Sequence, residues 1–213
     1  MSALENIINF KPISDEERMK LEAEEREVRC QNYFFRKIPE EFLEPVDRMR
    51  TTVDWKAFDG IQAWDGKKSI TARGPSQLGK TRAIYQALMS EVRRSGKRFK
   101  VVDEFDLIAK VSDAASAGKL ADLSKGWNQV DVLFFDDIDK VNFNQGVTGK
   151  NALALVFGVI KDRMSRRRPT ILSYNLSIAD FFAEAGEHTV NSLIERIKQK
   201  EHWMSVEFKQ PKL

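Results

Sequence analysis

The stretch Gly74-Pro75-Ser76-Gln77-Leu78-Gly79-Lys80-Thr81 decides the fold, because it fits the pattern G-x-x-x-x-G-K-[S/T]. It follows a short segment expected to be a strand, Ser69–Arg73, and opens a segment with helical spacing of apolar residues, Lys80–Ser95. Glycines let successive backbone N–H groups turn toward a phosphate, and the helix N-terminus adds a favourable dipole. We therefore predict that Gly74–Thr81 binds ATP. The Lys80 ammonium is expected at the β- and γ-phosphates, and the Thr81 hydroxyl is expected to ligate Mg²⁺.

Two carboxylates follow the most apolar part of the chain. Val132–Phe135 leads directly into Asp136 and Asp137, about 55 residues after the phosphate loop. A buried parallel strand carries the residues at its C-terminal end to the sheet edge where ligands bind in open α/β folds. We predict that Asp136 holds Mg²⁺, directly or through water, and that Asp137 polarises the attacking water as general base. A plain pair of loop carboxylates is the alternative.

Strand-like and helical segments alternate along the chain, which predicts βαβ units. The expected strands are Ser69–Arg73, Lys100–Val102, Val130–Phe135, Thr170–Ser173 and Met204–Phe208. The expected helices are Trp55–Trp64, Lys80–Ser95, Phe105–Lys125, Asn151–Arg166, Ile178–Ala185 and Val190–Gln199. The predicted fold class is therefore α/β, a three-layer P-loop NTPase with a five-stranded parallel sheet.

Composition excludes several other classes of protein. The 213 residues are 42% hydrophobic and 31% charged with a net charge of +3, which suits one folded domain with a short appendage. Cys30 is the single cysteine, so an intrachain disulfide and a Cys-rich zinc site are excluded. Neither a signal-peptide core nor an apolar run of roughly 20 residues is present, so we expect a cytoplasmic protein with no membrane partner.

The N-terminal segment is dense in charge and is expected to form an exposed helix over about Ser14–Cys30. Ser14 followed by Glu17 has the spacing of a capping box. We predict an N-terminal helical arm over residues 1–37 and an ATPase domain over residues 38–213. The arm is either a solvated helix or a docking helix for a partner, and the docking hypothesis predicts that deletion of residues 1–30 abolishes capture of that partner.

Together these motifs resemble the AAA+ ATPases, and more narrowly the DnaC/IstB group of helicase loaders and transposition helper ATPases. The resemblance covers about Ile38–Phe208, with Asp136-Asp137 where most AAA+ proteins have Asp-Glu. Two further stretches carry it. Pro169–Leu176 matches the strand of that group that ends in a sensor asparagine, and Ser192–Ile197 is similar to its "Asp-Arg-Leu" helix.

The resemblance implies roles for two more catalytic residues. Asn175 would be the first sensor, orienting water against the γ-phosphate, although a polar residue after an apolar strand is equally a turn former. Arg196 would be the arginine finger that enters the ATP site of a neighbouring subunit, which implies a homo-oligomer that forms on ATP; a helix-surface arginine is the alternative. The 17 residues after Arg196 are too few for a C-terminal lid domain, which that group generally lacks. The chain departs from the family pattern at Gln77, where glycine is common, and at Glu195, where aspartate is usual.

Basic residues form two dense clusters in the sequence. The first is Arg93, Arg94, Lys97, Arg98 and Lys100, and the second is Lys161, Arg163, Arg166, Arg167 and Arg168. Such clusters either neutralise nucleic-acid phosphates or interact favourably with the dipole at the C-terminal end of a helix. The resemblance suggests a further DNA surface around Lys110, Lys119 and Lys125, without a diagnostic pattern. Trp55 and Trp64 are expected in the core or near the adenine.

These observations favour an ATP-hydrolysing helper of DNA replication that loads or remodels a replicative helicase and binds single-stranded DNA. The same sequence suits a transposition helper that binds duplex DNA and recruits a transposase. A different class of function is a scaffold whose assembly is switched by ATP binding without hydrolysis. Such a scaffold would need fewer of these residues, so their joint presence argues against it: Lys80, Asp136, Asp137, Asn175 and Arg196. A small-molecule kinase is the remaining enzyme alternative, but nothing between the third and fourth expected strands resembles a phosphate-acceptor lid. The sequence leaves open the partner, the oligomer geometry and the form of DNA.

Overall fold

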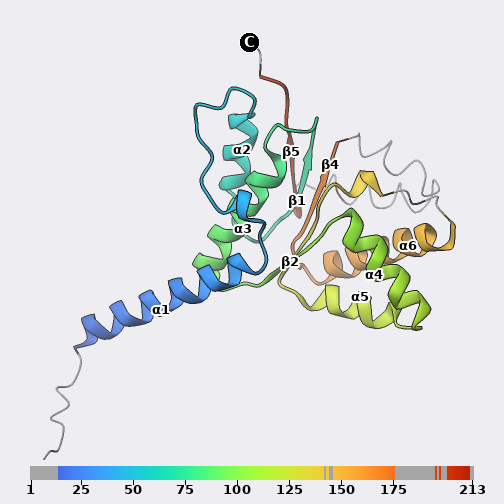
Figure 1. The fold of residues 1–213 in the computed structure, drawn as a ribbon, viewed down its shortest axis with the longest axis horizontal. Helices are drawn as coiled ribbons and strands as arrows, with labels where there is room; N and C mark the ends of the chain where they lie inside the picture. The colour runs from blue at the N-terminus through green and yellow to red at the C-terminus, as the bar shows by residue number, and fades with distance from the viewer. Residues whose placement is uncertain are drawn as a thin grey trace, which may run out of the picture.

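The computed structural model describes residues 14–141, 143, 146–175, 195, 197 and 201–211, and these form an α/β sandwich (Figure 1). Its strands are β1 (Ser69–Arg73), β2 (Phe99–Val102), β3 (Val132–Phe135), β4 (Thr170–Tyr174) and β5 (Trp203–Glu207). They form one sheet in the order β2-β3-β4-β1-β5, and every neighbouring pair is parallel. The predicted fold class is confirmed.

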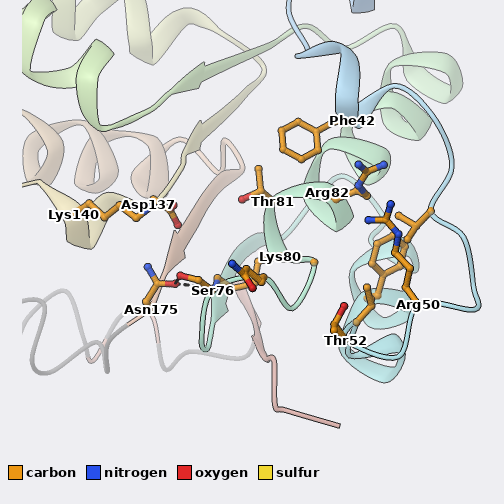
Figure 2. Close-up of a pocket in the computed structure, with 15 residues that line it drawn as sticks. Phe42, Arg50, Thr52, Ser76, Lys80, Thr81, Arg82, Asp137, Lys140 and Asn175 are labelled. Carbon is orange, nitrogen blue, oxygen red and sulfur yellow. Dashed lines mark hydrogen bonds and ion pairs between the residues drawn. The ribbon is translucent and has the colours of Figure 1, made fainter.

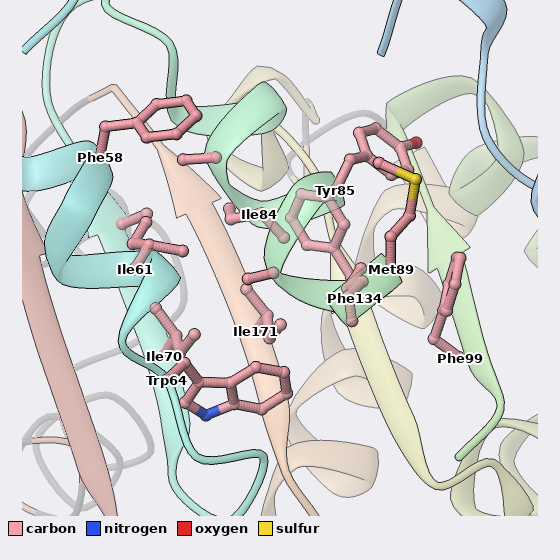
Figure 3. Close-up of a cluster of buried hydrophobic side chains, with 14 of the residues drawn as sticks. Phe58, Ile61, Trp64, Ile70, Ile84, Tyr85, Met89, Phe99, Phe134 and Ile171 are labelled. Carbon is pink, nitrogen blue, oxygen red and sulfur yellow. The ribbon is translucent and has the colours of Figure 1, made fainter. Parts of the chain in front are cut away.

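Helices cover both faces of this sheet (Figure 1). They are α1 (Asp15–Phe35), α2 (Trp55–Gln62), α3 (Lys80–Ser95), α4 (Glu104–Ser116), α5 (Leu120–Gln129) and α6 (Gly146–Ser165), with 3₁₀ turns η1 (Glu40–Phe42) and η2 (Ile138–Lys140). One apolar cluster lies between the sheet and α1–α3, as Figure 3 shows, and a second lies between the sheet and α4–α6. Among the described helices, none is long and apolar enough to cross a lipid bilayer.

The apolar positions that predicted α3 are the ones it buries. Ile84, Leu88 and Val92 recur every four residues along one face, and all three are buried. Each such side chain stabilises the fold by about 1.5–3 kcal/mol. Every residue of β3 is buried, as expected for a strand with helices on both faces.

The strand order brings three chain segments to one edge. β4 lies between β3 and β1, with Ser173 beside Ala72 of β1 and Leu172 beside Phe135 of β3. The residues that follow β1, β3 and β4 therefore meet at the carboxyl edge of the sheet. These are the phosphate loop, the aspartate pair and Asn175.

Some predicted elements differ from the structure. The single helix expected over Phe105–Lys125 is two helices, because Gly118 takes a φ of +66° that ends α4 before α5 begins. β3 begins at Val132 rather than Val130. The helices expected over Ile178–Ala185 and Val190–Gln199 lie outside the described residues, apart from residues 195 and 197.

Helix α1 combines an exposed first part with an anchored last part. Its first turn has the predicted capping box, with the Glu17 N–H donating to Ser14 Oγ at 3.2 Å. Cys30 and Phe34 are buried in the core. The Tyr33 hydroxyl donates to the Phe99 carbonyl at 2.7 Å and accepts from the Phe99 N–H at 2.9 Å. The helix thus continues past Cys30 and is fixed to β2.

Candidate ATP-binding site

The phosphate loop adopts backbone conformations that its glycines make accessible. Gly74 has a φ of +136°, and a Cβ atom there would lie 2.2 Å from the Phe208 carbonyl oxygen. Gly79 has a φ of +94° at the N-cap of α3. Gln77, where the family commonly has glycine, also has a positive φ of 67°. The loop therefore keeps a glycine-type conformation at this position, at a cost of about 1–2 kcal/mol for a residue with a side chain.

The Lys80 side chain is folded back onto the loop. Its ammonium donates to the carbonyls of Gly74 at 2.6 Å and Pro75 at 2.8 Å, and to Asn175 Oδ1 at 3.0 Å. Lys80 is only 5% exposed. Burial lowers its pKa, and the nearby carboxylates of Asp137, Asp139 and Asp136 oppose that effect. A phosphate would offer this ammonium oxygen acceptors of the same kind, with full negative charge.

Asp136 lies between two hydroxyls, one from the first turn of α3 and one from β4. Its Oδ1 accepts from Thr81 Oγ1 at 3.1 Å and from Ser173 Oγ at 2.5 Å. Burial raises the pKa of Asp136 to about 6, even though both hydroxyl hydrogen bonds act in the opposite direction. Burial therefore disfavours the charged form of this carboxyl.

Asp137 is turned away from Asp136 by its backbone. It has a φ of +49°, a left-handed conformation, and its N–H donates to Ser173 Oγ at 2.8 Å. Its carboxylate forms an ion pair with Lys140 at 2.5 Å, one turn ahead in η2. The carboxylate of Asp137 faces the same cavity as Lys80 (Figure 2).

Asn175 connects β4 to the phosphate loop. Its side-chain oxygen accepts from Lys80 and from Ser76 Oγ, the latter at 3.3 Å. Its backbone N–H donates to Asp139 Oδ2 at 2.8 Å. An amide held in this way can orient a water molecule.

Sequence reasoning missed two residues of this site, Ser173 and Asp139. Ser173 joins Asp136 to the backbone of Asp137, and Asp139 fixes Asn175. A serine at the end of an apolar strand and a third aspartate two residues after the pair were the signals that could have identified them.

These residues border a cavity of about 420 Å³ (Figure 2). Phe42, Val46, Val53 and Phe58 form an apolar part of its wall, which suits a purine ring. Trp55 and Trp64, expected in the core or near the adenine, do not line this cavity. Trp64 is buried and donates to the Lys68 carbonyl at 2.7 Å, and the Trp55 indole donates to the Arg50 carbonyl at 3.1 Å.

The residues present fit ATP with Mg²⁺. Mg²⁺ prefers oxygen ligands, few of them from protein, and Thr81 and Asp136 offer a hydroxyl and a carboxylate at hydrogen-bond distance. A divalent cation bound there would favour the charged form of the buried Asp136 carboxyl, whose pKa burial raises. Lys80 and the loop N–H groups would hold the phosphates.

Arg163 is not part of a nucleic-acid surface, although the sequence placed it in a basic cluster. Its side chain is 0% exposed and donates to the carbonyls of Trp127, Val130, Asp131 and Pro169 and to the Thr170 hydroxyl. It is a structural arginine that joins α5, α6 and the start of β4. Arg196, the predicted arginine finger, lies outside the described residues.

Comparisons with known proteins agree with this geometry. The profile of the family described as "IstB-like ATP binding protein" matches residues 40–210. No curated protein matches the chain. Among solved structures, the DnaC helicase loader superposes with a TM-score of 0.57 at 18% identity, over 84% of this chain and 99% of that one.

Two more solved structures share the fold. A putative primosome component from Streptococcus pyogenes gives a TM-score of 0.57 at 17% identity, over 83% of this chain and 92% of that one. AMPPCP-bound DnaA from Aquifex aeolicus gives 0.55 at 17% identity over 73% of this chain, and the chain spans only 45% of that DnaA. At such identities the likeness is one of fold.

Proposed function

This chain belongs to the family of IstB-like ATP-binding proteins, and from that premise we propose that it hydrolyses ATP to assist DNA replication in the cytoplasm. It would bind single-stranded DNA and load or remodel a replicative helicase. The structural neighbours that are named as a helicase loader and a primosome component support this reading.

The observation that carries the proposal is the convergence of polar groups at one sheet edge. Lys80 contacts Asn175, and Thr81 contacts Asp136, although these partners lie 95 and 55 residues apart in sequence. A site that only binds ATP needs the loop and a metal ligand. Hydrolysis also needs a base and a group that positions water, which are the roles proposed for Asp137 and Asn175.

The geometry supports a division of labour among these residues. Lys80 would neutralise charge that grows on the γ-phosphate oxygens, and Asn175 would orient the attacking water. Asp137 would accept the proton of that water once its carboxylate has separated from Lys140. Mg²⁺, when bound, supplies charge neutralisation at the phosphates.

We propose that Arg196 completes the site of a neighbouring subunit, so that the active form is an ATP-dependent homo-oligomer. Turnover per chain should then fall when the protein is diluted, because separated chains lack the partner arginine. Equal specific activity across a wide dilution series would contradict action between subunits.

A second function is favoured by the family itself. An IstB-like ATP-binding protein could equally serve transposition, gripping duplex DNA and recruiting a transposase. The two functions differ in the form of DNA that stimulates turnover and in the protein captured.

The test is steady-state ATP turnover with no DNA, with single-stranded DNA and with duplex DNA, beside Lys80→Ala. Stimulation by single-stranded DNA that disappears in Lys80→Ala supports the loader. Stimulation by duplex alone supports the transposition helper. Tight ATP binding without turnover under every condition would contradict hydrolysis and leave an ATP-switched scaffold.

The exposed part of α1 is our candidate for docking the partner protein. Met19 and Leu21 are 65% and 50% exposed on this otherwise charged segment. Deletion of residues 1–24 removes them but keeps Cys30, Tyr33 and Phe34, which hold the helix to the core. ATP binding should survive this deletion while capture of the helicase in a pull-down is lost; unchanged capture would contradict the proposal.

A further inference from the structure

Residues from both basic clusters of the sequence meet at the amino-terminal edge of the sheet, opposite the ATP site. Residues 95–98 precede β2, residues 167–169 precede β4, and residues 65–68 precede β1. Because all strands are parallel, these connections lie on the same edge. Basic residues far apart in sequence are thereby collected on one side of the molecule.

Two cavities of about 620 Å³ each open on this edge, and Lys97 lines both. Ten lysines and arginines line the two cavities, against three acidic side chains, Asp65, Asp131 and Glu201. We call these ten the amino-edge surface. They are Arg26, Arg29, Lys67, Lys68, Arg93, Arg94, Lys97, Arg98, Arg167 and Arg168.

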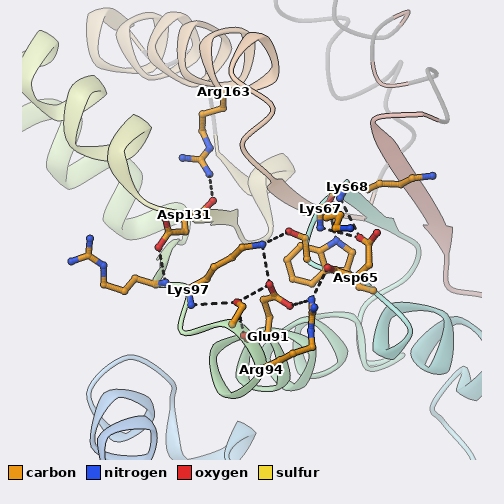
Figure 4. Close-up of polar contacts among 12 residues, drawn as sticks. Asp65, Lys67, Lys68, Glu91, Arg94, Lys97, Asp131 and Arg163 are labelled. Carbon is orange, nitrogen blue, oxygen red and sulfur yellow. Dashed lines mark hydrogen bonds and ion pairs between the residues drawn. The ribbon is translucent and has the colours of Figure 1, made fainter. Parts of the chain in front are cut away.

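The buried carboxylate of Glu91 holds Lys97, the residue that lines both cavities. Glu91 is 2% exposed, and its carboxylate pairs with Lys97 at 2.9 Å and with Arg94 (Figure 4). Lys97 also donates to the Gly66 carbonyl at 2.8 Å, which joins the end of α3 to the turn before β1. Glu91 thus holds Lys97 and Arg94 in place, and the surface keeps a net positive charge.

Other cations of the surface remain available to a ligand. Within the described part of the chain, the side chains of Arg26, Arg98 and Arg167 make no hydrogen bond or ion pair, and all three residues are exposed. Exposed, unpaired guanidinium groups attract phosphates through charge and bidentate hydrogen bonds.

We propose that the amino-edge surface binds the backbone of duplex DNA. The inference takes its ligand from the second function proposed above, which is directed to duplex DNA, but it requires neither ATP nor turnover. Duplex DNA carries one negative charge per about 1.7 Å of axis. A surface that spans two adjoining cavities can therefore meet several phosphates at once.

The aromatic residues of the two cavities favour duplex over single-stranded DNA. Single strands are held by aromatic faces on which bases stack. Among the described residues that line the cavities, the large aromatic ones are Tyr33 and Trp203, and the exposed imidazole of His202 is a single small ring. Tyr33 is engaged at β2, with its hydroxyl on Phe99 and its ring edge-on to it, and Trp203 is 3% exposed. Neither offers a face to a base.

The same lining argues against an acidic protein partner. Protein interfaces are anchored by aromatic and apolar side chains that enter pockets of the partner. The apolar floor of the cavity beside α1 is Cys30 and Val92, which are 8% and 8% exposed. Phosphate contacts need no such anchor.

The test compares duplex binding by the full chain and by a triple variant, Arg26→Gln, Arg98→Gln and Arg167→Gln, without nucleotide. The matched control, Lys56→Gln, Lys150→Gln and Lys209→Gln, removes three exposed lysines near the opposite edge. Losing three phosphate contacts should reduce the slope of log affinity against log salt by about 2.7. Between about 50 and 200 mM salt, the fold loss in affinity of the triple variant is then about 40 times smaller than that of the full chain.

We expect the triple variant to lose about tenfold or more in duplex affinity at low salt, with the control and the thermal unfolding midpoint unchanged. Its ATP turnover without DNA should equal that of the wild type, which separates this surface from the ATP site. Equal losses in the triple variant and the control would overturn the proposal. So would an equal loss of affinity of the triple variant for a single strand with the same number of phosphates, or equal competition by a poly-glutamate peptide.

Discussion

Replacement of Asp136 by asparagine should stabilise the nucleotide-free protein near neutral pH, although it damages the site. Burial raises the pKa of this carboxyl from 3.8 to about 6. The folded chain therefore binds the proton more tightly than the unfolded chain does. The free energy of unfolding falls as pH rises from about 4 to about 6, and the full cost is present above that range.

The size of the effect follows from that pKa. One pKa unit corresponds to about 1.4 kcal/mol, so ionised Asp136 costs the folded state up to about 3 kcal/mol. Asparagine carries no charge, and its Oδ1 can still accept from Ser173 and Thr81. Its amide group needs a new acceptor, which reduces the gain. We expect Asp136→Asn to raise the free energy of unfolding by about 1–3 kcal/mol at about pH 8, and by almost nothing at about pH 4.

Urea unfolding at a series of pH values measures this difference without nucleotide or metal. Asp113→Asn removes an exposed carboxylate on α4 and should change stability by less than about 0.5 kcal/mol throughout. A loss of stability in Asp136→Asn at about pH 8 would refute the reasoning. A gain of equal size at both ends of the pH series would refute it as well, since burial of charge would not be the cause.

Three further substitutions test the scaffold by urea unfolding. Gly74→Ala places a Cβ atom 2.2 Å from the Phe208 carbonyl oxygen at a positive φ, and should cost about 2–4 kcal/mol; a loss below about 1 kcal/mol would contradict this. Arg163→Met keeps the volume but strips four carbonyls of their donor, so we expect a loss of about 3–5 kcal/mol, and a neutral result would show that water replaces the guanidinium. Burial acts to raise the pKa of Glu91, but hydrogen bonds and charge, chiefly from Lys97, outweigh it and lower the pKa. The stability that ionised Glu91 contributes is therefore present above about pH 4.5 and lost as pH falls. Glu91→Gln should cost about 1–3 kcal/mol of unfolding free energy at about pH 7 and little at about pH 3. A cost independent of pH would contradict the charge pairing.

Local sequence signals predicted much of the fold. The bounds of β1 and α3 agree with the prediction at both ends, because Gly79 and Gly96 take positive φ values that start and stop the helix. Here the backbone freedom of glycine acts within a few residues, so the sequence pattern alone is sufficient. Gly118 had the same property, but the helical spacing around it concealed the break.

Contacts between distant segments could not be predicted in the same way. The sequence placed Arg163 among surface cations, yet four carbonyls from different segments converge on its guanidinium. Ser173 and Asp139 gained their roles only because the strand order sets β4 between β1 and β3. Their partners are defined by sheet topology, which no local pattern encodes.

The double hydrogen bond between Tyr33 and Phe99 also bears on solubility. β2 is an outer strand of the sheet, and an outer strand with free N–H and C=O groups recruits strands from other molecules. The Tyr33 hydroxyl occupies both groups of Phe99 at once. A truncation that removes all of residues 1–37 would expose this strand, and the resulting aggregation would imitate the loss of a binding partner.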